Sequence, residues 1–519
     1  MTRRRAYAIT IFLILLLCYG YFMPKWGDWN ANSRADLVYA VVDQGVLNIN
    51  AYHENTGDKA CFPGPYHLEE DRCEGDYYTD KSLGPSLVAV PFYAVFKVIA
   101  QIPPIQNMIE NGNLPGNFTD TLNPEGRGAL STSIYQGMAL TFMTFFAISV
   151  PSAILGTVIF LFASRFTPRL IHAFVLALAY GLATIAFPYS NTLVQHQLAA
   201  FGAFVGFYLI WRVIYEDAPV RWLWLSGALF GLATITEYPI VVVLGIIFLW
   251  AVYVYPKRIE LWRVVVGAIP LGLIFVAYNY AAFQSILPVG YEYSTLWQDE
   301  HNAGFLSFTT PSLERLYGLT FSPAKGLFLI SPFLLLTFPG LLLMWRQHRN
   351  QRPMTVALTL AIVGIFVIYS ASIMWWGGHT VGPRYLVPIL PFMALPIIAA
   401  FDALLKRSWG ILLTGVLLVW SVIVVWVQTI GGQSWPPTDA FLLTIDLMNS
   451  SNTFLDYSLP LILAGDVARN YGGIVLGLDG LAGLLPLLAL VVMIAVLVPA
   501  VLLRVEHRPQ RAEIASRTV

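Results

Sequence analysis

The sequence predicts an all-α polytopic membrane protein. Of its 519 residues, 57% are hydrophobic and 12% are charged, whereas charged residues make up about a quarter of a soluble domain. Apolar runs long enough for a helix to cross a bilayer, about 17–25 residues, recur along the chain. The formal net charge is zero, which argues against a nucleic-acid partner, so we expect the lipid bilayer as a partner and no nucleic acid.

Twelve apolar runs are long enough to be expected as spans, and a further run brings the range to 12–13. The first run follows the basic segment 3–5 and has no small-residue cleavage site after it, so we expect an uncleaved first span rather than a signal peptide. The run at 84–102 is ambiguous between a span and an interfacial helix. The twelve runs are 6–23, 135–163, 170–187, 192–211, 221–236, 238–255, 262–282, 326–345, 354–374, 385–402, 409–430 and 480–503.

Positive charge decides the expected orientation. If 3–5 is cytoplasmic and 84–102 does not span, every later short connector rich in Lys and Arg also falls on the cytoplasmic side. Counting 84–102 as a span would reverse all of these connectors and violate the positive-inside rule. We therefore expect an interfacial helix at 84–102 and cytoplasmic chain ends.

This orientation gives one membrane-embedded domain, 1–519, with long loops on one side only. Long loops in compact proteins are frequently functional. The expected parts are a first span at 6–23, a first exoplasmic loop at 24–130 with interfacial helices, spans within 135–282, an exoplasmic loop at 283–325, spans within 326–430, an exoplasmic loop at 431–479, a last span at 480–503 and a cytoplasmic tail at 504–519.

The first exoplasmic loop contains an expected surface helix and two cysteines. Ser33 is a plausible N-cap and Gly45 a stop signal, which predicts a short amphipathic helix on the outer membrane surface. Asp36 lies on this helix, and a solvated polar face is the alternative to a functional role for it. Cys61 and Cys73 could pair if the loop faces an oxidising compartment, but distance cannot be read from sequence.

Further polar residues fall where the chain meets the expected outer membrane surface. Lys81 precedes the 84–102 run, where a lysine either snorkels or holds a lipid phosphate. Glu237 ends one expected span, and acids near membrane depth suggest function, although an interfacial role is as consistent. His196 lies one turn inside another span, where a hydrogen-bonded core histidine is the commoner finding.

Two outer loops carry the remaining candidates. The connector Trp375–Tyr385 is rich in glycine and contains His379 and Arg384. The Arg384 guanidinium suits a phosphate group, although an aromatic-belt turn with one anchoring Arg is the alternative. The middle loop contains Tyr291 and His301 and could cover a site. No nucleotide-phosphate loop, zinc-ligand spacing or Gly-x-Ser-x-Gly elbow is found, so a nucleotide-driven mechanism has no support.

These segments resemble the GT-C superfamily of membrane glycosyltransferases, in the branch of protein O-mannosyltransferases and aminoarabinose transferases. Asp80–Lys81 is similar to the family's acid–Lys motif, except that Ser82 replaces the proline after the lysine. The strings Phe321–Pro332 and Gly382–Pro391 are similar to those of bacterial members. The family's acid pair after the first span would fall near Asn30, which is not acidic, so Asp28 and Asp36 are the nearest substitutes.

The resemblance implies a GT-C-like fold and transfer of a hexose or pentose from a polyprenyl-phosphate-linked co-substrate on the exoplasmic side of a bacterial plasma membrane. The acceptor is a hydroxyl group of a protein, lipid or glycan, and single displacement would invert the anomeric centre. Whether the reaction requires a divalent metal is left open. The expected catalytic acids are Asp36, Asp28, Asp58 and Asp80, the phosphate-binding residues are Lys81, Arg34 and Arg384, and the substrate-binding residues are Glu237, His196, His301, His379 and Tyr291.

The alternatives are a flippase or secondary transporter of lipid-linked sugars, and a polymerase or ligase of surface glycans. A transporter favours ionisable residues and broken helices near the middle of the bilayer. Here the charges gather at the outer ends of the spans, which favours a transferase.

Overall fold

The computed structural model describes residues 3–111, 134–296, 298–304, 307–437 and 444–516, with side chains up to 502 in the last helix. The described chain is mainly helical. Its strands are β1(Lys59–Phe62), β2(Tyr66–His67), β3(Arg72–Cys73) and β4(Asp76–Thr79). The prediction of an all-α polytopic membrane protein is confirmed at this level.

Eight helical segments within the described residues are long and apolar enough to cross a membrane. All eight coincide with expected spans, but the count of twelve is not confirmed. They are α1(Arg3–Tyr21), α5(Ile134–Thr144) continued by α6(Val150–Ala163), α8(Gln195–Tyr215), α11(Trp262–Phe283), α16(Arg352–Ala371), α17(Leu390–Leu404), α18(Ser408–Ile430) and the first part of α22(Leu485–Ser516), several of them with an added 3-10 or π turn.

The remaining four expected spans form shorter helices. Three are single helices of 13–15 residues, namely α7(Leu170–Leu182), α9(Trp222–Thr236) and α10(Ile240–Val254). The run 326–345 is divided into α14(Leu327–Ile330), a 3-10 turn at Pro332–Leu336 and α15(Thr337–Gln347). Pro332 explains this division, because proline lacks the N–H that a continuous helix would use.

The ambiguous run 84–102 forms the first helix of a bent helix pair. The pair consists of α3(Gly84–Ile99) and α4(Pro103–Glu110), whose axes differ by 94°. The bend coincides with consecutive prolines, Pro103 and Pro104, which begin α4 and disfavour a continuous helix before them. Such a pair is compatible with a broken span or a re-entrant loop, so the interfacial placement stays a prediction.

The expected surface helix is present, but it begins earlier and lies inside the protein. α2(Trp29–Tyr39) is capped by Asp28, whose Oδ1 accepts from the backbone N–H groups of Asn30 and Ala31, and not by Ser33. A π turn follows and ends at Gly45 in the left-handed conformation, with φ 71°. Nearly all of α2 is buried, so other parts of the protein cover this helix.

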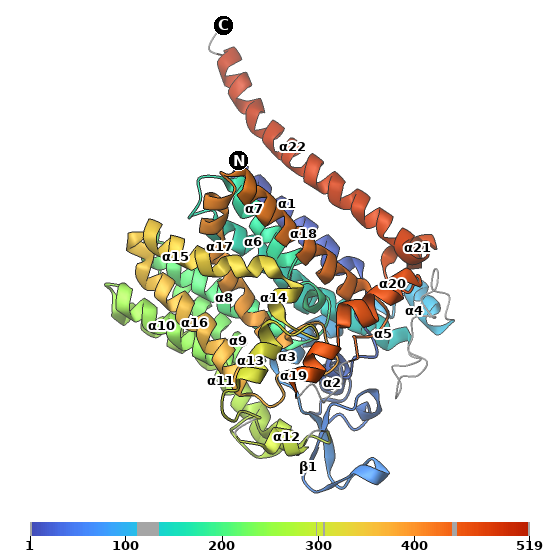
Figure 1. The fold of residues 1–519 in the computed structure, drawn as a ribbon. Helices are drawn as coiled ribbons and strands as arrows, with labels where there is room; N and C mark the ends of the chain where they lie inside the picture. Colours follow the sequence, from blue (N-terminus) through green and yellow to red (C-terminus); the bar gives the residue numbers. More distant parts are fainter. Residues whose placement is uncertain (1–2, 112–133, 297, 305–306, 438–443, 517–519) are drawn as a thin grey trace.

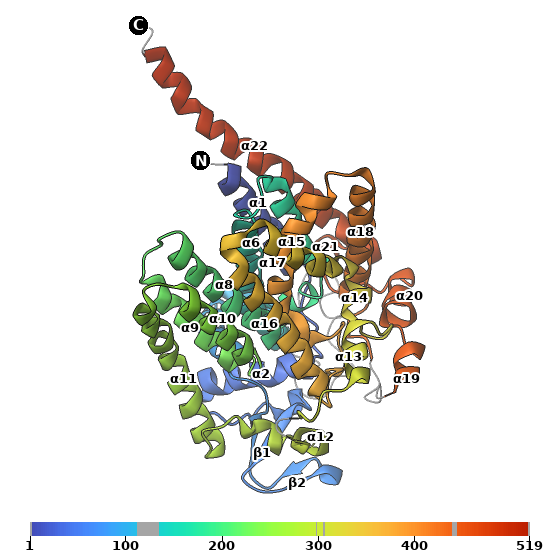
Figure 2. The ribbon, with the colours of Figure 1, turned by 60° about the vertical axis from the view of Figure 1, so that its left-hand side comes forward.

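The other helices are short. They are α12(Gln298–Asn302), α13(Leu313–Thr320), α19(Ile445–Ser450), α20(Leu459–Leu463) and α21(Tyr471–Leu476). The beginning of α1 and the end of α22 lie at one end of the molecule, and α2, α12 and the strands lie toward the opposite end (Figures 1 and 2). The apolar core of the helix bundle lies between these two ends.

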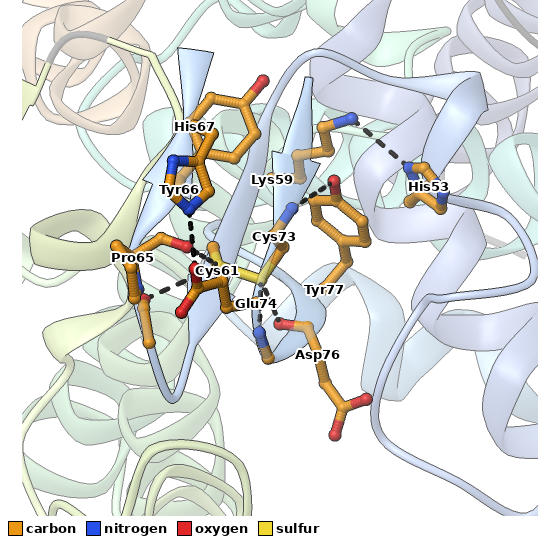
Figure 3. Close-up of a disulfide and its surroundings, with 12 residues drawn as sticks. His53, Lys59, Cys61, Pro65, Tyr66, His67, Cys73, Glu74, Asp76 and Tyr77 are labelled. Atoms are coloured by element: carbon orange, nitrogen blue, oxygen red, sulfur yellow. Dashed lines mark hydrogen bonds and ion pairs between the residues drawn. A yellow bond between two sulfur atoms is a disulfide. The ribbon is translucent and has the colours of Figure 1, made fainter. Parts of the chain in front are cut away.

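The strands form two small antiparallel pairs that carry part of the first loop. β1 pairs with β4 in the register Lys59 with Thr79, and β2 pairs with β3. Cys61 and Cys73 form a disulfide across this region, with their Cα atoms 5.6 Å apart (Figure 3). The pairing that the sequence left open is therefore present in the structure.

We predict that the double variant Cys61→Ser/Cys73→Ser unfolds at a lower temperature than the wild type. Closing a loop with a cysteine separation of 12 residues is worth about 3 kcal/mol in the chain-entropy account. Thermal unfolding should be measured in detergent with and without a reductant. The reductant should lower the wild-type midpoint and leave the variant unchanged. Two alkylatable thiols at these positions in the unreduced wild type would contradict the prediction.

Candidate functional site

A cavity of about 670 Å³ lies where the outer loops meet the ends of several helices. Its walls come from the segment after α1, the end of β4, the end of α9, the loop around α12, the connector between α16 and α17, and the segment after α18. Nine of the twelve candidate residues line it. They are Asp28, Asp58, Asp80, Lys81, Glu237, Tyr291, His301, His379 and Arg384.

Lys81 joins two of the candidate acids at one wall. Its Nζ lies 3.1 Å from Asp58 Oδ2 and 3.2 Å from Asp80 Oδ1. The register of β1 and β4 causes this meeting, because Asp58 directly precedes β1 and Asp80 directly follows β4. Ser294 adds a hydrogen bond of 2.9 Å to Asp80 Oδ2. The strand pair therefore brings together residues that lie far apart in the sequence.

Lys81 and Asp80 affect one another's pKa values. Burial works against the charged ammonium, but Asp58 and Asp80 together raise the pKa of Lys81 above its ordinary value. Burial raises the pKa of Asp80, while Lys81 opposes that rise. One cation and two carboxylates leave the trio with a net charge of −1 when all three are ionised. Lys81 is thus already balanced by protein carboxylates.

Arg384 enters the cavity from a connector with a fixed shape. Gly377, Gly378 and Gly382 adopt positive φ angles of 68°, 76° and 61°, which residues with a Cβ rarely adopt. A Cβ on Gly377 would come within 2.9 Å of Arg384 Nε. Glycine at position 377 therefore makes room for the guanidinium.

Lys325 forms hydrogen bonds to the same connector. Its side chain is fully buried, and its Nζ donates to the carbonyl groups of Trp376 at 2.5 Å and Gly378 at 2.6 Å and to Thr380 Oγ1 at 2.7 Å. Burial lowers the pKa of Lys325 well below its ordinary value. All three protons of the ammonium form are used, so Lys325 acts as a structural clamp. The sequence showed Lys325 within a family-like string but did not assign it a role.

The guanidinium of Arg384 remains available to a ligand. It lines the cavity, and no Asp or Glu of the described residues forms an ion pair with it. Its Nε has no hydrogen-bond partner among the described residues. The neighbouring Tyr385 ring lies 5.3 Å from the guanidinium carbon. A buried donor without a partner is costly, so a ligand with several acceptor oxygens would satisfy this site.

Glu237 reaches the cavity at the end of α9 and is held by two buried residues. His196 Nδ1 lies 2.8 Å from Glu237 Oε2, and the Tyr369 hydroxyl donates to Glu237 Oε1 at 2.9 Å. Glu237 lines the cavity, whereas His196 is fully buried behind it. The structure thus places His196 as a support for Glu237 and not in the cavity wall.

The middle loop contributes a histidine and a tyrosine. Burial, assisted by Lys81, lowers the pKa of His301 to about 4, so its imidazole is neutral at pH 7. Burial raises the pKa of Tyr291 to about 12. The two rings lie 4.9 Å apart, and Lys81 Nζ lies 5.5 Å from the centre of the Tyr291 ring. His379 lines the cavity from the connector and is exposed.

Asp36 and Arg34 do not line the cavity. Both side chains have no exposed surface. Asp36 accepts a hydrogen bond of 2.9 Å from Asn55, and burial raises the pKa of its carboxyl well above the ordinary value. The Asp36 side chain therefore does not contact the cavity, and the solvated polar face considered for it is wrong.

Arg34 connects three parts of the structure. Its guanidinium donates to the Asn30 carbonyl at 2.9 Å, to the Asn30 side chain, and to Gln195 Oε1 at 2.6 Å. It also lies 3.4 Å from Ser82 Oγ. These contacts hold α2, the loop after Lys81 and the start of α8 together, so Arg34 positions the cavity wall and does not face a ligand.

Lys25 and Trp435 are among the cavity residues that the sequence did not point to. Lys25 and Trp435 come from segments more than 400 residues apart, and Trp435 Nε1 donates to Asp28 Oδ2 at 2.5 Å. Lys25 follows the first apolar run, where a lysine is an ordinary membrane-interface residue. No local pattern links it to Trp435.

As to the metal left open above, no group of three or more metal-ligating side chains is found among the described residues.

Among the solved structures similar to this chain are two forms of ArnT. No protein-family model matches the chain, and no curated protein matches it. ArnT from Cupriavidus metallidurans bound to undecaprenyl phosphate is 17% identical, with a TM-score of 0.43 over 80% of this chain and 62% of that chain. The apo form is 16% identical, with a TM-score of 0.45 over 79% of this chain and 61% of that chain.

The chain thus spans less than two thirds of the length of either ArnT structure. At this level of similarity, the function has to be argued from the residues of the site.

We predict that Lys325→Met destabilises the protein and loosens the connector. The substitution removes the hydrogen bonds of Lys325 to the Trp376 and Gly378 carbonyls and to Thr380 Oγ1, and a buried polar group that loses its partner costs about 1–3 kcal/mol. Lys97→Met is the matched control, because Lys97 forms a partly exposed ion pair with Asp43 and such pairs contribute about 0–1 kcal/mol. Thermal unfolding and limited proteolysis would measure both effects. Equal unfolding midpoints for the two variants would contradict the clamp.

Proposed function

We propose that the chain is a membrane glycosyltransferase that moves a sugar from a polyprenyl-phosphate donor to an acceptor hydroxyl group. The observation that carries this proposal is one cavity, at the ends of apolar helices, that holds both an available guanidinium and a carboxylate partly open to it. Arg384 supplies the first and Asp58 the second. The combination fits a reaction in which a phosphate leaves and a hydroxyl group loses a proton.

Arg384 is proposed to bind the departing phosphate. A guanidinium presents a planar set of donors that matches two phosphate oxygens. The connector fixes its position before the substrate arrives, so little reorganisation is needed as negative charge develops. Because polyprenyl phosphate is a good leaving group, the reaction needs no strong general acid. A lipid-linked donor also explains why the cavity lies at the ends of membrane helices.

Asp58 is the proposed general base. Its side chain is 20% exposed, whereas that of Asp80 is 1% exposed and is bonded to Ser294 and Lys81. Asp28 already accepts two backbone N–H groups and the Trp435 indole. Asp58 is therefore the cavity acid with the most access to a substrate. Its Oδ2 lies 3.1 Å from Lys81 Nζ, which holds the carboxylate at the cavity wall.

The reaction is proposed as a single displacement. The acceptor oxygen attacks the anomeric carbon and forms the new glycosidic bond, while the bond from that carbon to the phosphate oxygen breaks. The acceptor proton moves to Asp58, and the bonding electrons leave with the phosphate. Attack from the side opposite the phosphate inverts the anomeric centre. Glu237, His301, His379 and Tyr291 line the remaining space and are proposed to bind sugar or acceptor hydroxyl groups.

The expected membrane orientation completes the proposal. We infer that the loops at 24–130, 283–325 and 431–479 face the exoplasmic side of a bacterial plasma membrane and that the chain ends are cytoplasmic. The clustering of basic connectors supports this orientation. The Cys61–Cys73 disulfide also supports it, because disulfides persist in oxidising compartments.

We predict that Asp58→Asn lowers the rate of sugar transfer by about 10²–10⁴-fold, the usual contribution of a general base. The amide keeps the shape of the side chain but cannot accept the proton. Transfer would be followed with a radiolabelled polyprenyl-phosphate sugar and membrane acceptors. Glu54→Gln is the matched control, because Glu54 is exposed and does not line the cavity.

Full activity of Asp58→Asn would remove Asp58 from the proposed mechanism. Movement of labelled lipid across the membrane without any transfer would favour the flippase alternative instead.

We predict that a cysteine introduced at Leu68 reacts with an impermeant maleimide added to intact cells, whereas a cysteine at Ile259 reacts only after permeabilisation. Both side chains are exposed, at 70% and 82%, and lie in segments expected on opposite sides of the membrane. The native cysteines give little background, because Cys18 is buried and the other two form the disulfide. The reverse labelling pattern would contradict the orientation.

A further inference from the structure

Three cationic side chains line the cavity within the described residues, and they differ in how their charges are balanced. Lys81 is balanced by Asp58 and Asp80. Arg384 and Lys25 form no ion pair with any described carboxylate. Lys25 is 8% exposed, and its Nζ donates to the Gly432 carbonyl at 3.0 Å. An ammonium group has three donors, so this bond leaves capacity for a ligand.

Backbone pairing between distant segments positions Lys25. Phe22 pairs with Asn470, and Gly431 pairs with Val467, in isolated antiparallel bridges. The backbone N–H of Met23 donates to the Arg469 carbonyl at 2.8 Å. The segment after α1 therefore lies beside the segments at 431–435 and 466–470. This arrangement fixes the backbone of Lys25 next to the Gly432 carbonyl.

A pair of stacked aromatic rings connects Lys25 to the connector that carries Arg384. Lys25 Nζ lies 5.2 Å from the centre of the Trp435 ring. Trp435 stacks on Tyr189, with ring centres 5.7 Å apart and planes inclined by 23°. The Tyr189 hydroxyl in turn donates to the Val381 carbonyl at 2.8 Å, within the connector that carries Arg384. The Tyr189–Trp435 stack thus links Lys25 to the connector of Arg384.

We propose that Lys25 is a second phosphate-binding residue, which acts with Arg384 on the phosphate group of the lipid donor beside the Tyr189–Trp435 stack. This inference rests on the proposed function and extends it to a residue from the segment directly after the first span. The ligand chemistry is a phosphate monoester or diester carried by a lipid. Lys81 then forms ion pairs with Asp58 and Asp80 and does not bind the phosphate.

The reaction gives a physical reason for two cations. The phosphate of a polyprenyl-phosphate sugar is a diester with one negative charge, and the departing monoester carries two above its second pKa, near neutral pH. Negative charge therefore grows on this group during transfer. A second cation binds the leaving phosphate more strongly than the donor, so it lowers the barrier as well as adding affinity. Arg384 and Lys25 together match the final charge.

The charge of Lys25 gives the site a pH dependence. Burial lowers the pKa of Lys25 to about 8, while Asp466 and Asp28 favour the ammonium form and Arg469 opposes it. Lys25 is protonated below that pKa and loses its charge as the pH rises through it. Affinity for a phosphate monoester should therefore fall between about pH 7 and 9. Burial also lowers the pKa of Arg469 to about 9, so the contribution of Lys25 has to be separated by substitution.

The test is binding of radiolabelled undecaprenyl phosphate to the purified full chain in detergent, with undecaprenol as the uncharged probe. We predict that Lys25→Gln weakens binding of the phosphate by tenfold or more at pH 7 and leaves undecaprenol unchanged. Lys97→Gln is the control for the loss of one lysine outside the cavity and should match the wild type. Lys25→Arg should retain binding and remove most of the decline up to pH 9.

Two results would overturn the inference in different ways. If the wild type binds undecaprenyl phosphate and Lys25→Gln binds it equally well, Lys25 is not a phosphate ligand and the proposed function stands. If the wild type shows no preference for the phosphate over undecaprenol, the proposed function fails and the inference fails with it. Should Lys25→Gln not fold, the pH profiles of the wild type and Lys25→Arg decide, and identical profiles would count against Lys25.

Discussion

The ammonium group of Lys81, shared between Asp58 and Asp80, holds the outer loop in the position that the cavity requires. Breaking a buried ion pair by removing one partner costs about 3–5 kcal/mol, so the contacts of Lys81 stabilise this loop. The β1–β4 pair delivers both carboxylates to one place, and the Cys61–Cys73 disulfide closes the same region (Figure 3). The stability of the first loop and the geometry of the cavity therefore depend on the same contacts.

Burial and pairing divide the cationic residues of this region into different roles. Lys325 uses its donors on the connector, and Arg34 uses its donors on neighbouring segments. Both are fully buried, so their hydrogen bonds support the framework and do not face a ligand. Arg384 and Lys25 face the cavity without a carboxylate partner among the described residues. The negative charge that balances Arg384 and Lys25 is therefore expected to come from a bound ligand.

The sequence predicted the features that depend on local composition. Apolar runs located the long helices, and polar residues at the expected outer ends included Asp58, Lys81 and Arg384. It did not predict the start of α2, because several polar residues there could cap a helix and Asp28 does so. It also placed Asp36 in the site, although the fold buries this acid behind the cavity wall.

Long-range pairing accounts for most of what the sequence could not show. Lys25 meets Trp435 because short backbone bridges align three segments from distant parts of the chain, and no periodicity or motif encodes that contact. Likewise, His196 supports Glu237 from a different helix, and only the packing of α8 against the end of α9 reveals it. Candidate residues can be listed from a sequence, but the division between ligand-facing and supporting roles needs the fold.

The most direct test of the central claim is a density map of the full chain with undecaprenyl phosphate bound. The account predicts that the phosphate lies in the cavity within hydrogen-bond distance of the Arg384 guanidinium, with the Asp58 carboxylate facing the space where an acceptor would approach. A phosphate bound at another surface, with Arg384 and Asp58 both remote from it, would contradict the account.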